Sequence, residues 1–172
     1  FPGTSGRWRG GPYVDVDMAT FGTDDGERHG AAAFRYSHSV GGLDYALSHF
    51  WGLSRAPLFN ITTNSKGETV YAPHYEPINQ TGIEFQLVAE QILMKFEGIY
   101  RSGQGSAYGA VTTGFEFSVP GILSTKTDLG FLAEWLYDDR GELATTPFQN
   151  DYLLGLRFTF NDLADTKVLI GM

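Results

Sequence analysis

The sequence predicts an all-β fold, an antiparallel up-and-down β-barrel segment in which each strand pairs with the next. Three observations predict it. Apolar and polar residues alternate along segments of roughly ten residues, and turn-forming residues separate these segments. The chain is also rich in glycine and aromatic residues, with 22 Gly and 15% aromatics among 172 residues. We count about nine strands and interpret residues 1–172 as one segment of a larger barrel.

The strands of the first third are predicted at residues 13–21, 32–40 and 43–48. The first is the weakest, because its apolar residues recur only at Val14, Val16 and Met18. In the next two, large apolar residues such as Phe34 and Tyr45 alternate with polar ones. A period of two places alternate side chains on opposite faces of a strand.

The remaining strands are predicted at residues 83–89, 92–101, 107–117, 128–138, 151–161 and 166–172. The segment 151–161 is the clearest, since five large apolar residues occupy alternate positions: Tyr152, Leu154, Leu156, Phe158 and Phe160. A helix would distribute these side chains around its circumference, whereas a strand places them in one row.

The connections alternate between short and long. Short turns are expected at residues 40–42, 89–91 and 161–165, and longer links at 22–30, 54–80, 102–106 and 141–149. The link 118–127 is longer than this order requires. Membrane barrels have short turns at one end and long external loops at the other. We therefore expect residues 54–80 to form a long external loop, with a small hairpin from 59–62 and 68–72 around Asn64-Ser65-Lys66-Gly67.

The alternating faces predict a barrel that crosses a membrane. The apolar rows have about five positions, enough for the 9–11 residues that span the hydrocarbon. The opposite rows carry charges of both signs, which suit a hydrated lumen better than a dry core. The predicted lumen-lining residues are Arg35, Asp44, Glu84, Lys95, Glu97, Glu116, Glu134 and Arg157. They would either set the field that a solute meets or form salt-bridge ladders that hydrate and fill the barrel.

Aromatic residues concentrate near the strand ends that lead to the predicted external loops. They are Phe21, Trp51, Tyr100, Trp135, Tyr137 and Tyr152. We expect them to form a membrane-interface girdle, because such rings prefer the headgroup layer.

Composition excludes several classes of protein. Twelve Lys and Arg against twenty Asp and Glu give a net charge of −8, which argues against a nucleic-acid partner. The absence of cysteine excludes disulfides and thiolate metal sites. No close histidine pair predicts a metal site, and we expect no metal, no cofactor and no catalytic residues.

Two alternatives stay open. A soluble, lipocalin-like barrel that binds an apolar ligand would turn Phe115, Trp135 and Phe158 into a cavity. A barrel hydrolase would use His38 or His49 as a base, with a Ser or Asp within hydrogen-bond reach.

Several segments carry a resemblance: GQG (103–105), GFEF (114–117), DLGFLAEWLYD (128–138), TPFQND (146–151) and LRFTFND (156–162). They resemble the uncharacterised porin-like outer-membrane β-barrel proteins of Gram-negative bacteria. The resemblance implies a longer protein with a signal peptide and further strands. Because this chain begins Phe1-Pro2-Gly3 without an export signal and ends Ile170-Gly171-Met172, we interpret it as an internal fragment.

The expected function is that of a porin-like channel in the bacterial outer membrane, not an enzyme. Small hydrophilic solutes would pass through the charged lumen, and outer-membrane lipid would contact the apolar face. The remaining barrel strands or a second copy would close the sheet, because unpaired edges are costly in lipid.

Overall fold

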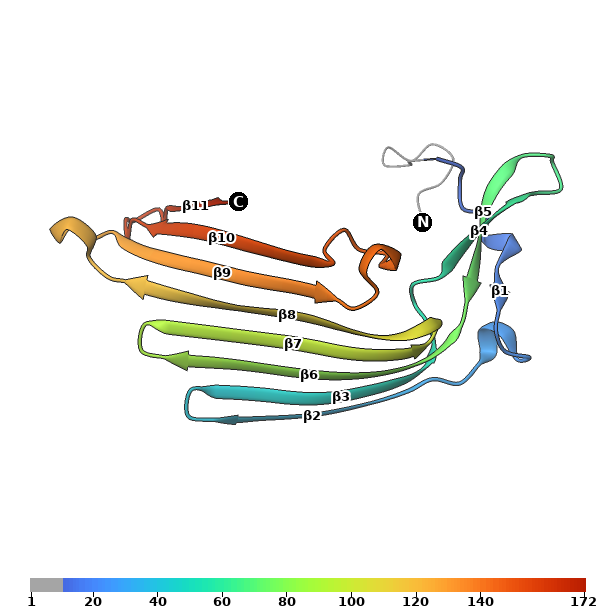
Figure 1. The fold of residues 1–172 in the computed structure, drawn as a ribbon, viewed down its shortest axis with the longest axis horizontal. Coiled ribbons are helices and arrows are strands. Elements are labelled where there is room, and N and C mark those ends of the chain that lie inside the picture. Colours follow the sequence, from blue (N-terminus) through green and yellow to red (C-terminus); the bar gives the residue numbers. More distant parts are fainter. Residues whose placement is uncertain (1–10) are drawn as a thin grey trace. The chain divides into compact units, whose positions relative to one another are not determined.

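The computed structural model describes residues 11–172 and is all-β (Figure 1). Its strands form an eight-stranded antiparallel sheet and a separate three-stranded sheet. Residues 1–10, which include the start considered for an export signal, lie outside the described part. None of the helices in residues 11–172 has the length and apolar character needed to cross a bilayer.

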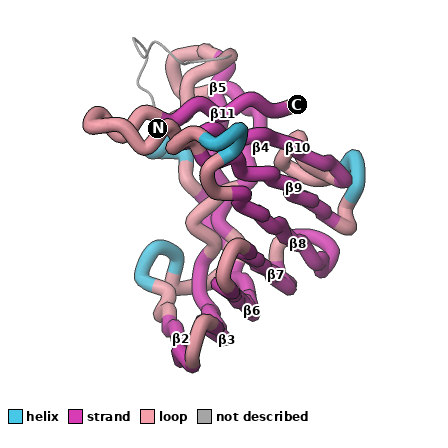
Figure 2. Tube along the Cα trace, turned by 90° about the vertical axis from the view of Figure 1, so that its left-hand side faces the viewer, coloured by secondary structure: helices cyan, strands magenta, loops and turns pink. Residues whose placement is uncertain are grey.

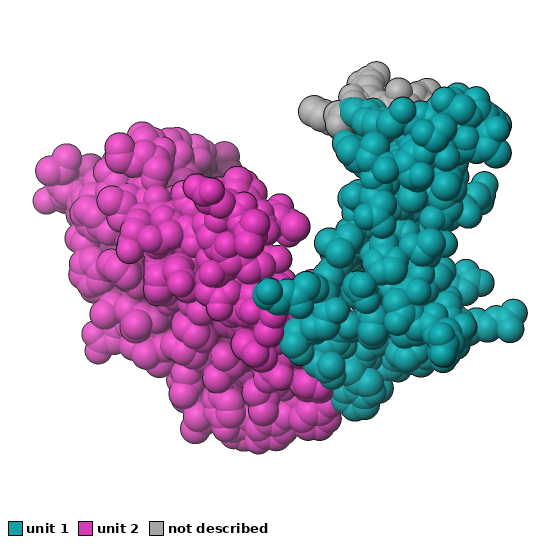
Figure 3. Space-filling model, turned by 45° about the vertical axis from the view of Figure 1, so that its right-hand side comes forward, with its two compact units in different colours: residues 1–33, 50–79, 102–106 teal, residues 34–49, 80–101, 107–172 magenta. Residues whose placement is uncertain are grey.

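Two compact units make up the chain (Figure 3). Unit 1 contains residues 1–33, 50–79 and 102–106, and holds the three-stranded sheet. Unit 2 contains residues 34–49, 80–101 and 107–172, and holds most of the eight-stranded sheet.

The eight-stranded sheet confirms the predicted up-and-down order (Figure 2). Its strands, in spatial order from one edge, are β2 (Ala32–Val40), β3 (Leu43–Leu53), β6 (Pro77–Ala89), β7 (Ile92–Gly103), β8 (Gly105–Val119), β9 (Asp128–Asp138), β10 (Asn150–Thr159) and β11 (Lys167–Gly171). The first and last of these each have one neighbour, so the sheet is open and not closed into a barrel.

The three-stranded sheet has the order β1 (Thr20–Phe21), β5 (Thr69–Tyr75), β4 (Leu58–Thr63). The antiparallel β4–β5 pair confirms the hairpin predicted within residues 54–80. The prediction of a strand over 13–21 is wrong, because this segment contains the 3₁₀ turn η1 (Val16–Met18) and only the short β1. The carboxylate of Asp15 caps that turn by accepting a bond from the amide of Asp17, which favours a turn over an extended strand.

The strand β1 pairs with β5 in parallel, not antiparallel as the up-and-down prediction requires. Thr20 lies opposite His74, and the two side chains approach within 2.7 Å, between Oγ1 and Nδ1. On the other side of the imidazole, Nε2 lies 2.9 Å from Oε1 of Glu76. These polar contacts and the stacked rings of Phe21 and Tyr75 attach β1 to β5.

The predicted long link at residues 102–106 is wrong, since only Gln104 separates β7 from β8. Two glycines make the tight connection possible, because Gly103 has φ +107° and Gly105 has φ +75°. Gly103 also lies against another strand, and a Cβ added to it would come within 2.2 Å of the carbonyl oxygen of Pro77. Positive φ and close backbone approach both require glycine at position 103.

We expect Gly103→Ala to lower the free energy of unfolding by about 1–3 kcal/mol, because an L residue must then adopt a strained φ against backbone. Gly67→Ala is the matched control, since Gly67 has φ +78° but no atom near its Cβ position. Urea titration followed by tryptophan fluorescence measures both variants. An equal loss of unfolding free energy in both variants would show that the close approach of Pro77 to Gly103 does not matter.

The registers of β8–β11 show which side chains share a face. Leu156 lies opposite Phe131 on one side and Ile170 on the other, and Phe131 lies opposite Phe117. These four form an apolar row across four strands, and paired residues in a sheet point to the same side. The opposite face carries Glu116, paired with Leu132. The sheet therefore has an apolar face and a polar face, as the alternation predicts.

The large side chains of the apolar row are not the buried residues of the eight-stranded sheet. In the described residues, the buried apolar residues are Ala46, Val70, Ala72, Ile78 and Tyr108. None of the large side chains of the apolar row is among them. On the polar face, in contrast, Glu116 and Asp138 are buried. A soluble sheet covers its apolar face with a second layer, and within residues 11–172 this one has no such cover.

Candidate functional site

The candidate site is the polar face of the eight-stranded sheet in unit 2. All eight residues predicted to line a lumen lie in two open pockets on this face, which share Lys95 and Glu97. The structure therefore brings together charges that are far apart in the sequence. Their alternation with apolar residues along each strand was the signal that found them.

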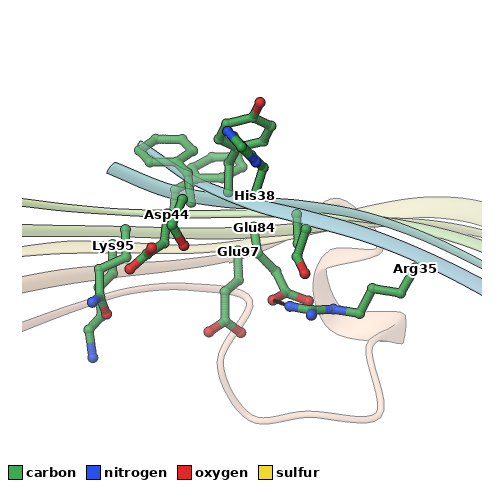
Figure 4. A pocket seen from close by; sticks show the side chains of 13 residues that line it. Arg35, His38, Asp44, Glu84, Lys95 and Glu97 are labelled. Carbon is green, nitrogen blue, oxygen red and sulfur yellow. Dashed lines mark hydrogen bonds and ion pairs between the residues drawn. The ribbon is translucent and has the colours of Figure 1, made fainter. Parts of the chain in front are cut away.

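The first pocket, of about 230 Å³, lies over β2, β3, β6 and β7. Figure 4 shows Asp44, Glu84, Lys95 and Glu97 projecting from one side of the sheet, whereas His38 projects from the other. Arg35 donates from Nη2 to Oε2 of Glu84 at 2.8 Å. The pocket thus contains one ion pair and three further charges.

The second pocket, of about 330 Å³, lies over β7, β8, β9 and β10. Glu116 and Arg157 form an ion pair there. Lys95, Glu97 and Glu134 also line this pocket. Across both pockets, five carboxylates and three basic groups leave an excess of negative charge.

A loop that the sequence analysis did not assign to the site also lies against the polar face. Thr146 and Phe148, from the β9–β10 link, line a third pocket of about 230 Å³ with Glu97, Thr112 and Leu136. The sequence predicted an external loop here, and no pattern in residues 139–149 indicated which surface it would contact.

Arg140 anchors the start of this loop. Its guanidinium donates to both carboxylate oxygens of Asp138, at 2.9 Å from Nε and 2.6 Å from Nη2. It also lies 3.6 Å from the ring centroid of Tyr108. Hydrogen bonding to Asp138 raises the pKa of the Arg140 guanidinium, so the group stays charged. Because Asp138 is only 3% exposed, this anchor neutralises a buried carboxylate.

The predicted interface aromatics occupy different surroundings. Trp135 contacts the rings of Tyr137 and Tyr152, and its indole nitrogen donates to Oδ1 of Asn150 at 2.9 Å. Trp51 and Tyr100, near the ends of β3 and β7, are exposed. Phe21 lies instead on β1 and stacks on Tyr75 in the three-stranded sheet. Their role at a membrane interface stays a prediction.

The hydrolase alternative names His38 and His49 as bases, and each has a contact in the structure. His49 Nδ1 lies 2.9 Å from Oγ1 of Thr81, and the ring of His38 packs edge-on against Tyr45. Neither contact is with the Ser or Asp that a base and nucleophile would require.

The lipocalin-like alternative requires an enclosed apolar cavity. Phe115 and Leu154 line a pocket of about 560 Å³ on the apolar face, but their side chains are 50% and 55% exposed. The pocket is an open depression on a sheet surface. Of the three residues that this alternative turns into a cavity, Phe115 lines this depression, whereas Trp135 and Phe158 are half-buried elsewhere on the sheet.

Comparison with known proteins gives no match to a protein family, a curated protein or a solved structure. The porin-like resemblance of the sequence therefore stays a prediction, and the function has to be argued from the geometry of the two faces.

Proposed function

We propose that this chain is part of an outer-membrane β-barrel that lets small hydrophilic solutes cross the membrane of a Gram-negative bacterium. Further strands or a second copy close the sheet, the apolar face contacts lipid, and the polar face lines the pore. No cofactor is needed, because passage follows size and charge.

The observation that carries the proposal is the uncovered apolar face. Phe117, Phe131, Leu156 and Ile170 form a continuous row, and all are exposed. In water such a surface would be strongly unfavourable, since soluble proteins rarely expose large continuous apolar patches. In a bilayer it is the surface that lipid requires.

The polar face supports the same proposal. Eight of its charged residues line open pockets and are not enclosed in an apolar core. Charged groups of this kind need water or a partner, and a wet lumen supplies the water. The excess of carboxylates favours cations over anions.

Planar-bilayer recording of the full-length protein, purified from its native membrane, tests the proposal. We expect stepwise conductance in potassium chloride and a reversal potential, under a salt gradient, that indicates cation preference. Protein that inserts into vesicles but conducts no ions would overturn the channel function. Protein that stays monomeric and folded in detergent-free buffer would overturn the membrane assignment.

A further inference from the structure

Two ion pairs on the polar face share an arrangement. Arg35 on β2 reaches Glu84 on β6, and Arg157 on β10 reaches Glu116 on β8. In each case the partners are not on neighbouring strands, because β3 lies between the first two and β9 between the second two. Each pair therefore links three strands.

A small residue of the intervening strand accompanies each pair. Gly130 on β9 lies opposite Arg157, and a Cβ added to it would approach Oε1 of Glu116 to 3.0 Å. On β3, Ala46 is buried and lines the same pocket as Arg35 and Glu84. Small side chains at these positions leave space for the ion pairs to cross over the strand.

The other four charged residues of the two pockets behave differently. Asp44, Lys95, Glu97 and Glu134 are all exposed. Within residues 11–172, none of them belongs to an ion pair. Lys95 and Glu97 lie in both charged pockets, between the two crossing pairs.

We propose that the charges of the polar face divide by role, and this inference rests on the proposed channel function. Arg35–Glu84 and Glu116–Arg157 are structural crosslinks between strands. Asp44, Lys95, Glu97 and Glu134 are the residues that set the selectivity, and their three carboxylates against one ammonium make small cations the favoured solutes.

The physical reason is the distance dependence of the field. Opposite charges in contact form a dipole, whose potential decays faster with distance than that of a single charge. A passing ion about 8 Å away, at the screening length of physiological salt, therefore responds mainly to the unpaired groups. Paired groups instead contribute to holding the strands together, most of all where one partner is buried, as Glu116 is.

Four variants of the full-length protein test this division, with reversal potential and urea midpoint as separate readouts. We expect Glu97→Gln to lower the potassium-to-chloride permeability ratio by about twofold, and Lys95→Gln to raise it by about twofold. Neither should move the urea midpoint. Arg157→Gln, which removes the same charge as Lys95→Gln, should lower the midpoint because it leaves Glu116 without its partner.

The double variant Glu116→Gln with Arg157→Gln is the matched control. It removes one charge of each sign, and we expect the wild-type permeability ratio together with a midpoint above that of Arg157→Gln. A permeability change in the double variant as large as in Glu97→Gln would overturn the division of roles. So would an equal loss of midpoint in Lys95→Gln and Arg157→Gln. A wild-type protein without conductance would overturn the channel function itself. The urea midpoints of the variants would still test whether the ion pairs stabilise the sheet.

Discussion

Replacing Leu154 by arginine should destabilise the protein in lipid by about 2–4 kcal/mol, whereas the same change at Leu153 should cost about 0.5 kcal/mol. The two residues are adjacent near the middle of β10 and face opposite sides of the sheet. Leu154 lies opposite Ala133 on the apolar face, and Leu153 lies opposite Glu134 on the polar face. Under the proposed membrane assignment, the guanidinium enters hydrocarbon in the first variant and a wet, carboxylate-lined surface in the second.

The pair of variants separates lipid from water as the solvent of the apolar face. Both leucines are exposed on the sheet, at 39% for Leu153 and 55% for Leu154. If water covered both faces, each arginine would be solvated and the two costs would be similar and small. Urea unfolding in phospholipid vesicles, followed by tryptophan fluorescence, measures the difference. Costs within about 0.5 kcal/mol of each other would contradict the lipid-facing assignment.

Arg140→Ala is expected to lower the free energy of unfolding by about 3 kcal/mol, because it leaves the carboxylate of Asp138 buried without its partner. The ring of Tyr108 would lose its cation contact at the same time. The β9–β10 link, which begins at this anchor, would be released from the polar face. We therefore also expect a larger single-channel conductance.

Two further variants make the test specific. Arg140→Lys keeps the charge but not the two-pronged geometry, so we expect an intermediate loss of stability. Arg55→Ala removes an exposed arginine elsewhere and should leave both readouts unchanged. An Arg140→Ala protein with wild-type stability would show that the anchor does not stabilise the loop. Unchanged conductance in a destabilised variant would show that the loop does not limit passage.

Strict alternation predicted the strands of unit 2 well. The segments 32–40 and 128–138 agree with β2 and β9 at both ends. Alternation works there because one face of the sheet is apolar and the other polar, so a shift by one residue would exchange the two. The same pattern identified the eight charged residues that line the two pockets of the polar face.

The failures lie where local hydrogen bonds or glycine geometry decide the conformation. The segment 13–21 alternates, but Asp15 caps a 3₁₀ turn and the short β1 pairs in parallel. The connection at Gln104 is tight because Gly103 and Gly105 both adopt positive φ. From composition alone, two glycines so close together indicated a longer loop. The contact between Arg140 and Tyr108 joins the β9–β10 link to strand β8, and no periodicity predicts such a contact.

The two edge strands of the large sheet determine whether an even or an odd number of further strands can close it. Eight alternating strands leave β2 and β11 running in opposite directions. Strands β4 and β5 lie between β3 and β6 in the chain but belong to the other sheet. They therefore do not change the alternation of strand directions in the large sheet. Whatever closes the sheet without a parallel pair must therefore contribute an even number of strands. A second copy, direct joining of the two ends, or whole hairpins all satisfy this condition, and a single inserted strand does not.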